Sequence, residues 1–144
     1  PPLLRRCWYG LNQAFRRRIM QLGLTPTQFT ILRWLNEADE SGLNQKHLAE
    51  KMASDPNTIA SLVCRMKEAG LVGCDVDPDD RRAKRVRILA KGRRLFEQAT
   101  PHALELQDTV LEAIPAADRP KFLRQLEALA DACQDEIDPG AAEL

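Results

Sequence analysis

The spacing of apolar residues changes along this chain from the helical period of three to four to the strand period of two, and then back again. This change constrains the fold most strongly. Up to Gly70 the apolar residues recur every three or four positions, which is typical of helices. Over 72–76, and again at Val86 and Ile88, apolar residues alternate with polar ones, which predicts strands with one buried face. The segment 77–80, Asp-Pro-Asp-Asp, has a composition typical of a tight turn. We therefore expect a β-hairpin set between helical segments.

Four helices are expected before the hairpin, over about 3–22, 26–37, 45–52 and 56–69. Thr25 and Asp55 are each followed by proline, so a capping side chain precedes a residue suited to the first helical position. Gln28, three residues after Thr25, completes a capping-box pattern. Asn44 is the expected cap of the short third helix, and Gly70 the stop of the fourth.

Two further helices are expected after the hairpin, over about 91–113 and 117–136, and the residues 138–144 should form a frayed tail. Their apolar stripes are too extensive to be buried within so short a chain, so they predict a partner. The residues in these stripes are Leu95, Ala99, Leu106, Val110, Leu111, Phe122, Leu126, Leu129, Ala130 and Cys133.

The fourth helix has two contrasting faces. Ile59, Val63 and Met66 belong to a narrow apolar stripe, whereas the opposite face and its flanks are small and polar. Short polar side chains would let this helix approach the major groove of DNA closely, with the basic hairpin beside it as a wing. The pattern predicts a mainly α fold with a winged helix-turn-helix. The alternative is a solvated basic hairpin beside a small helical bundle.

The formal net charge of zero conceals a division along the chain. Residues 1–100 carry 18 basic and 11 acidic side chains, and residues 101–144 carry 3 and 10, so the two parts have net charges of +7 and −7. A basic first part fits a nucleic-acid partner although overall neutrality argues against one. The residues 81–94 hold eight basic and no acidic side chains: Arg81, Arg82, Lys84, Arg85, Arg87, Lys91, Arg93 and Arg94.

The four cysteines, Cys7, Cys64, Cys74 and Cys133, have no C-x-x-C spacing, so neither a metal nor another cofactor is expected. No apolar run is long enough to cross a bilayer, and nothing resembles a secretory leader. We expect a cytoplasmic protein with free thiols and no membrane contact.

The chain also resembles the MarR family of bacterial winged-helix regulators. The resemblance covers about 22–99 and rests on LTPTQF at 24–29, LAEKM at 48–52, MKEAGLV at 66–72, DPDDRR at 77–82 and Gly92. It implies a single domain over 1–144, with a winged helix-turn-helix lobe over 24–90 and dimerisation helices over 1–22 and 91–137. It also implies a homodimeric repressor that binds a pseudo-palindromic operator on double-stranded DNA.

The resemblance implies roles for individual residues. Asp80 and Arg82 match the D-x-R signature of the wing, in which the arginine reaches the minor groove and the aspartate stabilises the wing. Arg65 is a candidate ion partner for Asp80; alternatively Asp80 caps its own turn. The residues implied to contact DNA are Gln45, Asn57, Thr58, Ala60, Ser61, Arg65, Arg81, Arg82 and Lys84. Ser61 stands where many relatives carry arginine, Cys74 where a wing arginine is common, and Leu89 where a capping threonine is usual.

A pocket for a small aromatic or phenolic effector is also implied, and Trp8, Phe15, Phe29 and Trp34 are the aromatic residues that could line it. Ordinary core or dimer packing is at least as good an interpretation of each. A thiol-based redox-sensing regulator is a weaker alternative, because the position of Cys7 matches poorly that of the peroxide-sensing relatives.

Two other classes of function were weighed. A winged-helix protein-interaction module, using the hairpin and the acidic tail without binding DNA, is the main alternative. An enzyme is the weakest interpretation, because the sequence shows no Ser/His/Asp arrangement and no phosphate-binding glycine loop.

Overall fold

The structure is a computed structural model that describes residues 1–137, so the frayed tail expected at 138–144 lies outside the described residues. Its elements are α1 (Pro2–Ile19), a 3-10 helix η1 (Met20–Leu22), α2 (Pro26–Glu37), β1 (Leu43–Asn44), α3 (Gln45–Lys51), α4 (Pro56–Glu68), β2 (Val72–Val76), β3 (Lys84–Ile88), α5 (Ala90–Leu111) and α6 (Arg119–Ile137). The mainly α fold with a small β-hairpin is confirmed. Helix boundaries lie within three residues of the expected ones, and those of α2 match them.

By its contacts the chain divides into two compact units, residues 1–106 and the residues from 107 onward. The first unit contains the helices α1 to α4, the sheet and most of α5; the second contains α6. The division into a lobe over 24–90 and dimerisation helices over 1–22 and 91–137 stays a prediction. Across residues 1–137, no helix has both the length and the apolar character needed to span a membrane.

Side-chain caps start three of the helices, as the sequence predicts. The Thr25 hydroxyl accepts from the backbone N–H of Gln28 at 3.2 Å, and the side-chain Oε1 of Gln28 accepts from the backbone N–H of Thr25 at 3.0 Å, which completes the capping box. Asn44 caps α3 and Asp55 caps α4. Each cap contributes about 1 kcal/mol to helix stability.

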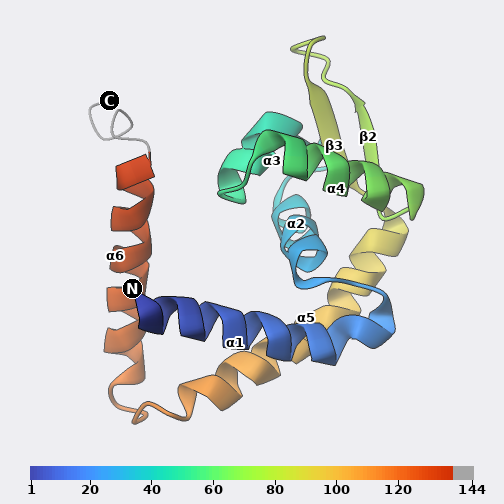
Figure 1. Ribbon diagram of the computed structural model, residues 1–144. Helices are drawn as coiled ribbons and strands as arrows, with labels where there is room; N and C mark the ends of the chain where they lie inside the picture. Colours follow the sequence, from blue (N-terminus) through green and yellow to red (C-terminus); the bar gives the residue numbers. More distant parts are fainter. Residues whose placement is uncertain (138–144) are drawn as a thin grey trace. The chain divides into compact units, whose positions relative to one another are not determined.

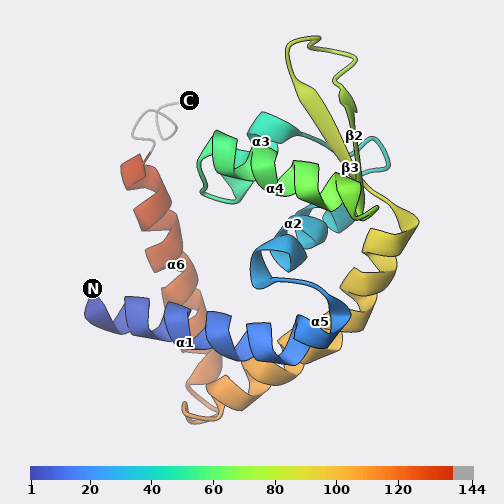
Figure 2. The same ribbon diagram turned by 45° about the vertical axis from the view of Figure 1, so that its right-hand side comes forward.

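The hairpin of β2 and β3 (Figures 1 and 2) belongs to a three-stranded antiparallel sheet with the order β1-β3-β2. Val86 lies at its centre, opposite Cys74 of β2 on one side and Leu43 of β1 on the other. The sequence did not predict β1, because two residues are too few to show an alternation. The hairpin tip extends past α3 and α4 in both views.

The core of the first unit lies where α2, α3 and α4 meet the sheet. The apolar stripe expected on α4 faces inward, since Ile59, Val63 and Met66 are buried. Further buried members of the core include Leu32, Leu35, Leu48, Val72 and Val86, and Ile19 of α1 and Ala99 of α5 extend it. The opposite face of α4 is therefore exposed at the surface, and it carries the small polar side chains that the sequence pattern predicted there.

Candidate nucleic-acid interface

The exposed face of α4 carries short polar side chains. Asn57, Thr58, Ser61 and Cys64 are exposed, and Ala60 is half-buried among them. The Thr58 hydroxyl donates to Oδ2 of the capping residue Asp55 at 3.3 Å, so it is already engaged within the protein. In residues 1–137 no hydrogen bond occupies the Asn57 amide, which leaves both its donor and its acceptor available to a partner.

The two cations at the end of α4 are partly engaged. Nε of Arg65 lies 3.5 Å from the Ser61 carbonyl oxygen, one turn back along the helix. Nζ of Lys67 donates to the Cys74 carbonyl oxygen of β2 at 3.1 Å. Lys67 therefore ties the last turn of α4 to the wing.

A buried carboxylate holds the base of the wing. Asp77, only 3% exposed, accepts from the backbone N–H of Asp79 at 2.9 Å and from Nδ2 of Asn44 at 3.1 Å. Nε of Arg85 lies 3.7 Å from the same carboxylate. The hydrogen bonds from Asp79 and Asn44, and then the Arg85 charge, hold the pKa of Asp77 below its ordinary value. Because Asn44 also caps α3, this cluster joins the wing to the helix-turn-helix.

Asp80 has a more local contact than the expected one. Its carboxylate accepts from the backbone N–H of Arg82 at 3.0 Å, within its own turn. Among the described residues, Asp80 and Arg65 form no ion pair, so the expected partnership is wrong. The alternative, a turn aspartate that caps its own loop, is the one observed. The sequence analysis missed Asp77. The available signal was aspartate at the first position of a turn with proline next, where its side chain can accept from the N–H two residues on.

Half of the eight basic residues in 81–94 are engaged within the protein. Arg87 pairs with Asp75 at 2.6 Å, and Arg85 donates to the Gly42 carbonyl oxygen at 2.8 Å. Lys91 donates to the Ala69 carbonyl oxygen, at the end of α4, and Arg93 donates to the side-chain oxygen of Asn36 in α2. The basic side chains left exposed and without a partner among residues 1–137 are Arg81, Arg82, Lys84 and Arg94.

Comparison with known proteins agrees with this geometry. The model of the MarR family matches residues 24–84. The chain is similar to the transcriptional repressor NicR of Pseudomonas putida, at 29% identity over 90% of this chain and 80% of NicR. It is 30% identical to CouR of Rhodococcus jostii, solved with p-coumaroyl-CoA, over 89% of each chain with a TM-score of 0.77. It is 27% identical to the regulator MosR of M. tuberculosis, solved with DNA, over 91% of this chain and 95% of MosR with a TM-score of 0.73.

The chain belongs to the MarR family. Its winged helix-turn-helix is therefore the family's fold, and the residues that the resemblance singled out take the positions described above on α3, α4 and the wing. Which of them contact DNA in this member of the family stays a prediction.

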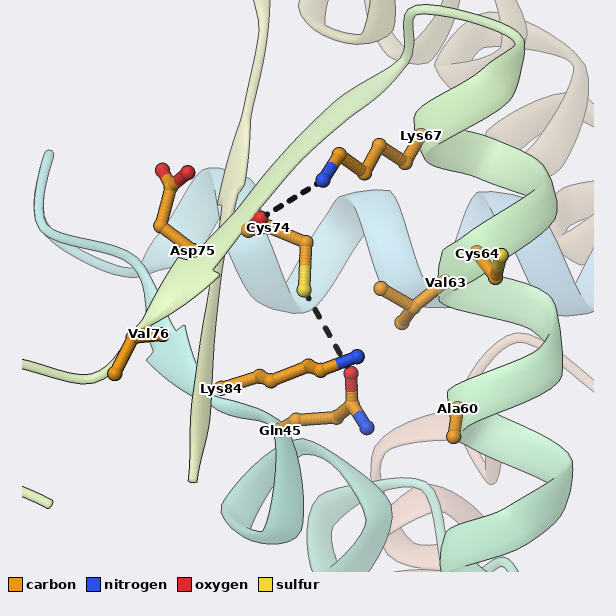
Figure 3. A pocket seen from close by; sticks show the side chains of 9 residues that line it. All are labelled: Gln45, Ala60, Val63, Cys64, Lys67, Cys74, Asp75, Val76 and Lys84. Carbon is orange, nitrogen blue, oxygen red and sulfur yellow. Dashed lines mark hydrogen bonds between the residues drawn. The ribbon is translucent and has the colours of Figure 1, made fainter. Parts of the chain in front are cut away.

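A cavity of about 370 Å³, open to solvent, lies between α4 and the wing (Figure 3). Three of the expected DNA contacts share its wall, Gln45 from α3, Ala60 from α4 and Lys84 from β3. Sγ of Cys74 points across it toward Oε1 of Gln45, at 3.8 Å. The full lining is Gln45, Ala60, Val63, Cys64, Lys67, Cys74, Asp75, Val76 and Lys84.

The four aromatic residues expected to line an effector pocket of the MarR type do not converge. Phe15 and Phe29 are in edge contact at 4.9 Å between ring centroids, and Phe29 stacks on Phe96 of α5 at 5.3 Å. The Trp34 ring contacts two cations, those of Arg33 and Lys51, at 4.8 and 4.7 Å from its centroid, and Trp8 is 66% exposed. None of the four borders the cavity beside α4. Packing, the alternative interpretation, is the one that the structure supports for Phe15 and Phe29.

The four cysteines are free. Cys7, Cys64 and Cys133 are exposed, and Cys74 is partly buried. Within the described part of the chain, no three His, Cys, Asp or Glu side chains gather as metal ligands would.

Proposed function

We propose that this protein is a sequence-specific DNA-binding transcriptional regulator. One observation carries the proposal: α4 exposes a face of short polar side chains beside a wing whose Arg81, Arg82 and Lys84 are exposed and unengaged within residues 1–137. A recognition helix with such a face can enter the major groove, while unpaired wing cations are available to phosphates and the minor groove. That MosR was solved with DNA supports the same conclusion.

The regulator acts as a homodimer on a pseudo-palindromic operator. The apolar side chains exposed on the first and last helices support this, because a single chain leaves them in water. On α1 they are Leu3, Leu4, Trp8 and Leu11, and on α6 they are Phe122, Leu123, Leu126, Leu129 and Ile137. A two-fold dimer would present two copies of α4 to two half-sites.

The protein works as a repressor in the cytoplasm, has no enzymatic activity and is released by a small aromatic effector. NicR, a repressor, and CouR, solved with p-coumaroyl-CoA, support the first and last of these statements. Trp8, Phe15, Phe29 and Trp34 stay candidates for the effector site, although Phe15 and Phe29 are in ring contact with each other and Phe29 also stacks on Phe96.

Duplex binding tests the proposal. Fluorescence anisotropy with labelled duplexes from the region upstream of the protein's own coding sequence should show binding at low salt. The affinity should fall by a factor on the order of 10³ between about 50 and about 200 mM salt if roughly six phosphates are contacted. Absence of binding at low salt to any duplex would contradict the proposal and favour the protein-interaction module.

A further inference from the structure

The first two and a half turns of α4, about nine residues, lack the side chains that most often read guanine. Residues 56–64 contain no charged group, and the commonest specific contact to guanine is a bidentate one from arginine or lysine to its O6 and N7 atoms. The exposed groups over this stretch are one amide, two hydroxyls, a thiol and methyl groups. This face can therefore discriminate bases, but with a chemistry that excludes the usual guanine contact.

What the face does offer suits A·T pairs. Asn57, exposed in the first turn and free of hydrogen bonds in the described chain, has the donor and acceptor that pair with N7 and N6 of adenine. The hydroxyl of Thr58 is engaged by Asp55, so its methyl group is left for an apolar contact. Ala60 adds a second methyl, and such groups contact the C5-methyl of thymine.

The nearest cation on the helix is Arg65, which follows Asn57 by eight residues, about 12 Å along the axis. Its Nε is turned back to the Ser61 carbonyl oxygen at 3.5 Å, so the guanidinium is partly engaged by the helix's own backbone. With Asn57 at the bases of a groove about 12 Å wide, the Arg65 end of the helix lies at the phosphate edge. Lys67 is directed at the wing, where its Nζ meets the Cys74 carbonyl oxygen (Figure 3).

The wing adds an independent preference in the same direction. Arg81 and Arg82 are exposed at the tip, without a side-chain partner in residues 1–137. Arginines inserted into the minor groove favour A·T tracts, in which that groove is narrow and its negative potential strongest. Both DNA-facing elements thus favour the same class of sequence.

We propose that the half-site read by α4 is built of A·T pairs, with Asn57 reading an adenine and the methyl groups of Thr58 and Ala60 lying against thymine methyls. This inference rests on the proposed function. It adds to it the class of operator and the residue that determines specificity.

Selection from a random duplex library by the full chain, followed by sequencing, tests the inference. We expect paired half-sites of A·T pairs. Changing one adenine to guanine should weaken wild-type binding roughly tenfold, whereas Asn57→Ala should bind both duplexes equally. Ser61→Arg should gain a guanine at one position. Thermal unfolding of each variant shows whether the fold is kept.

Arg65→Ala is the matched control on the same helix. It should lower affinity for all duplexes alike and leave the selected sequence unchanged, as loss of a phosphate contact does. Recovery of half-sites with G·C pairs at the position that depends on Asn57 would overturn the inference while the proposed function stands. A·T half-sites that Asn57→Ala reads as sharply as the wild type would also overturn it. Failure to bind any duplex at low salt would instead contradict the proposed function itself.

Discussion

At the scale of single residues, Asp77 determines how the wing is attached. Its carboxylate meets the Asp79 N–H, the Asn44 amide and the Arg85 guanidinium, which come from the turn, from the residue before α3 and from β3. A buried carboxylate is stable only when its oxygens are paired in this way. Loss of the Asp77 charge should therefore destabilise the wing before the rest of the fold.

The lowered pKa of Asp77 makes a prediction about pH. A group whose pKa is lowered in the folded state contributes stability above its ordinary value, here 3.8, and that contribution is lost as the pH falls through the folded-state pKa. The free energy of unfolding of the wild type should therefore fall steeply below about pH 5, and that of Asp77→Asn less steeply. Urea unfolding at several pH values measures both.

Asp79→Asn is the control for this change, since Asp79 is exposed in the same turn. It should keep the steep dependence of the wild type. Asp39, whose pKa is lowered by hydrogen bonds from Ser41, leaves a residual slope in all three proteins. Equal slopes for the wild type and Asp77→Asn would show that the wing does not depend on this charge.

Asp77 and Asp80 differ in how far their contacts can be predicted from the sequence. Both lie in a turn that composition alone identifies, but the burial of Asp77 depends on Asn44, which is 33 residues earlier in the chain. The same holds for the aromatic residues, because the ring that stacks on Phe29 comes from α5. Contacts of this kind are set by tertiary packing and leave no local pattern.

At the scale of elements, the close approach of α5 to Leu71, the residue before β2, depends on a glycine. A Cβ added to Gly92 would lie 2.2 Å from the Leu71 carbonyl oxygen and 3.1 Å from Cδ2 of Leu32. The first contact is with backbone, so α5 itself would have to move. Because α5 follows directly after β3, such a movement would be transmitted to the wing.

Gly92→Ala should therefore destabilise the protein although alanine favours helices. We expect a loss of about 1–3 kcal/mol from overpacking, measured by urea unfolding. Gly10→Ala is the matched control, because Gly10 lies within α1 with nothing within 4 Å of an added Cβ. It should gain about 0.5–1 kcal/mol. Gains in both variants would contradict the close packing of α5 on Leu71.

Local signals predicted the helices and the hairpin well, since caps, prolines and alternation act within a few residues. The capping box at Thr25 and the caps at Asn44 and Asp55 are all present. Strand β1 could not be predicted, because it exists only through its pairing with Val86 and Arg85 of β3. Likewise the sequence contains eight basic residues over 81–94, but the packing of the folded chain decides which of them have no partner within the described residues.

At the scale of the whole molecule, the proposed dimer can be tested on α6. No residue of α6 is buried within the chain, and Phe122, Leu126, Leu129 and Cys133 follow a spacing of three and four along it. Leu126→Glu should shift the protein toward monomer in sedimentation and weaken operator binding. Gln125→Glu, which adds the same charge at the preceding position, should change neither the oligomeric state nor operator binding. If Leu126→Glu remains a dimer, the interface does not include this face of α6.

The division of charge along the chain also has a consequence for the whole molecule. The part with a net charge of +7 includes α4 and the wing, whereas the part with −7 includes α6. Overall neutrality should keep non-specific binding modest. Affinity for DNA should then depend on a few exposed cations, of which Arg82 is the most informative.

The salt dependence of operator binding, compared between Arg82→Ala and Arg17→Ala, tests the central claim most directly. Both variants remove one exposed arginine per protomer, but Arg17 lies on α1. For Arg82→Ala the slope of log affinity against log salt should become shallower by about two, one contact for each wing of the dimer. For Arg17→Ala it should not change. Equal slopes in the two variants and the wild type would contradict DNA binding through α4 and the wing.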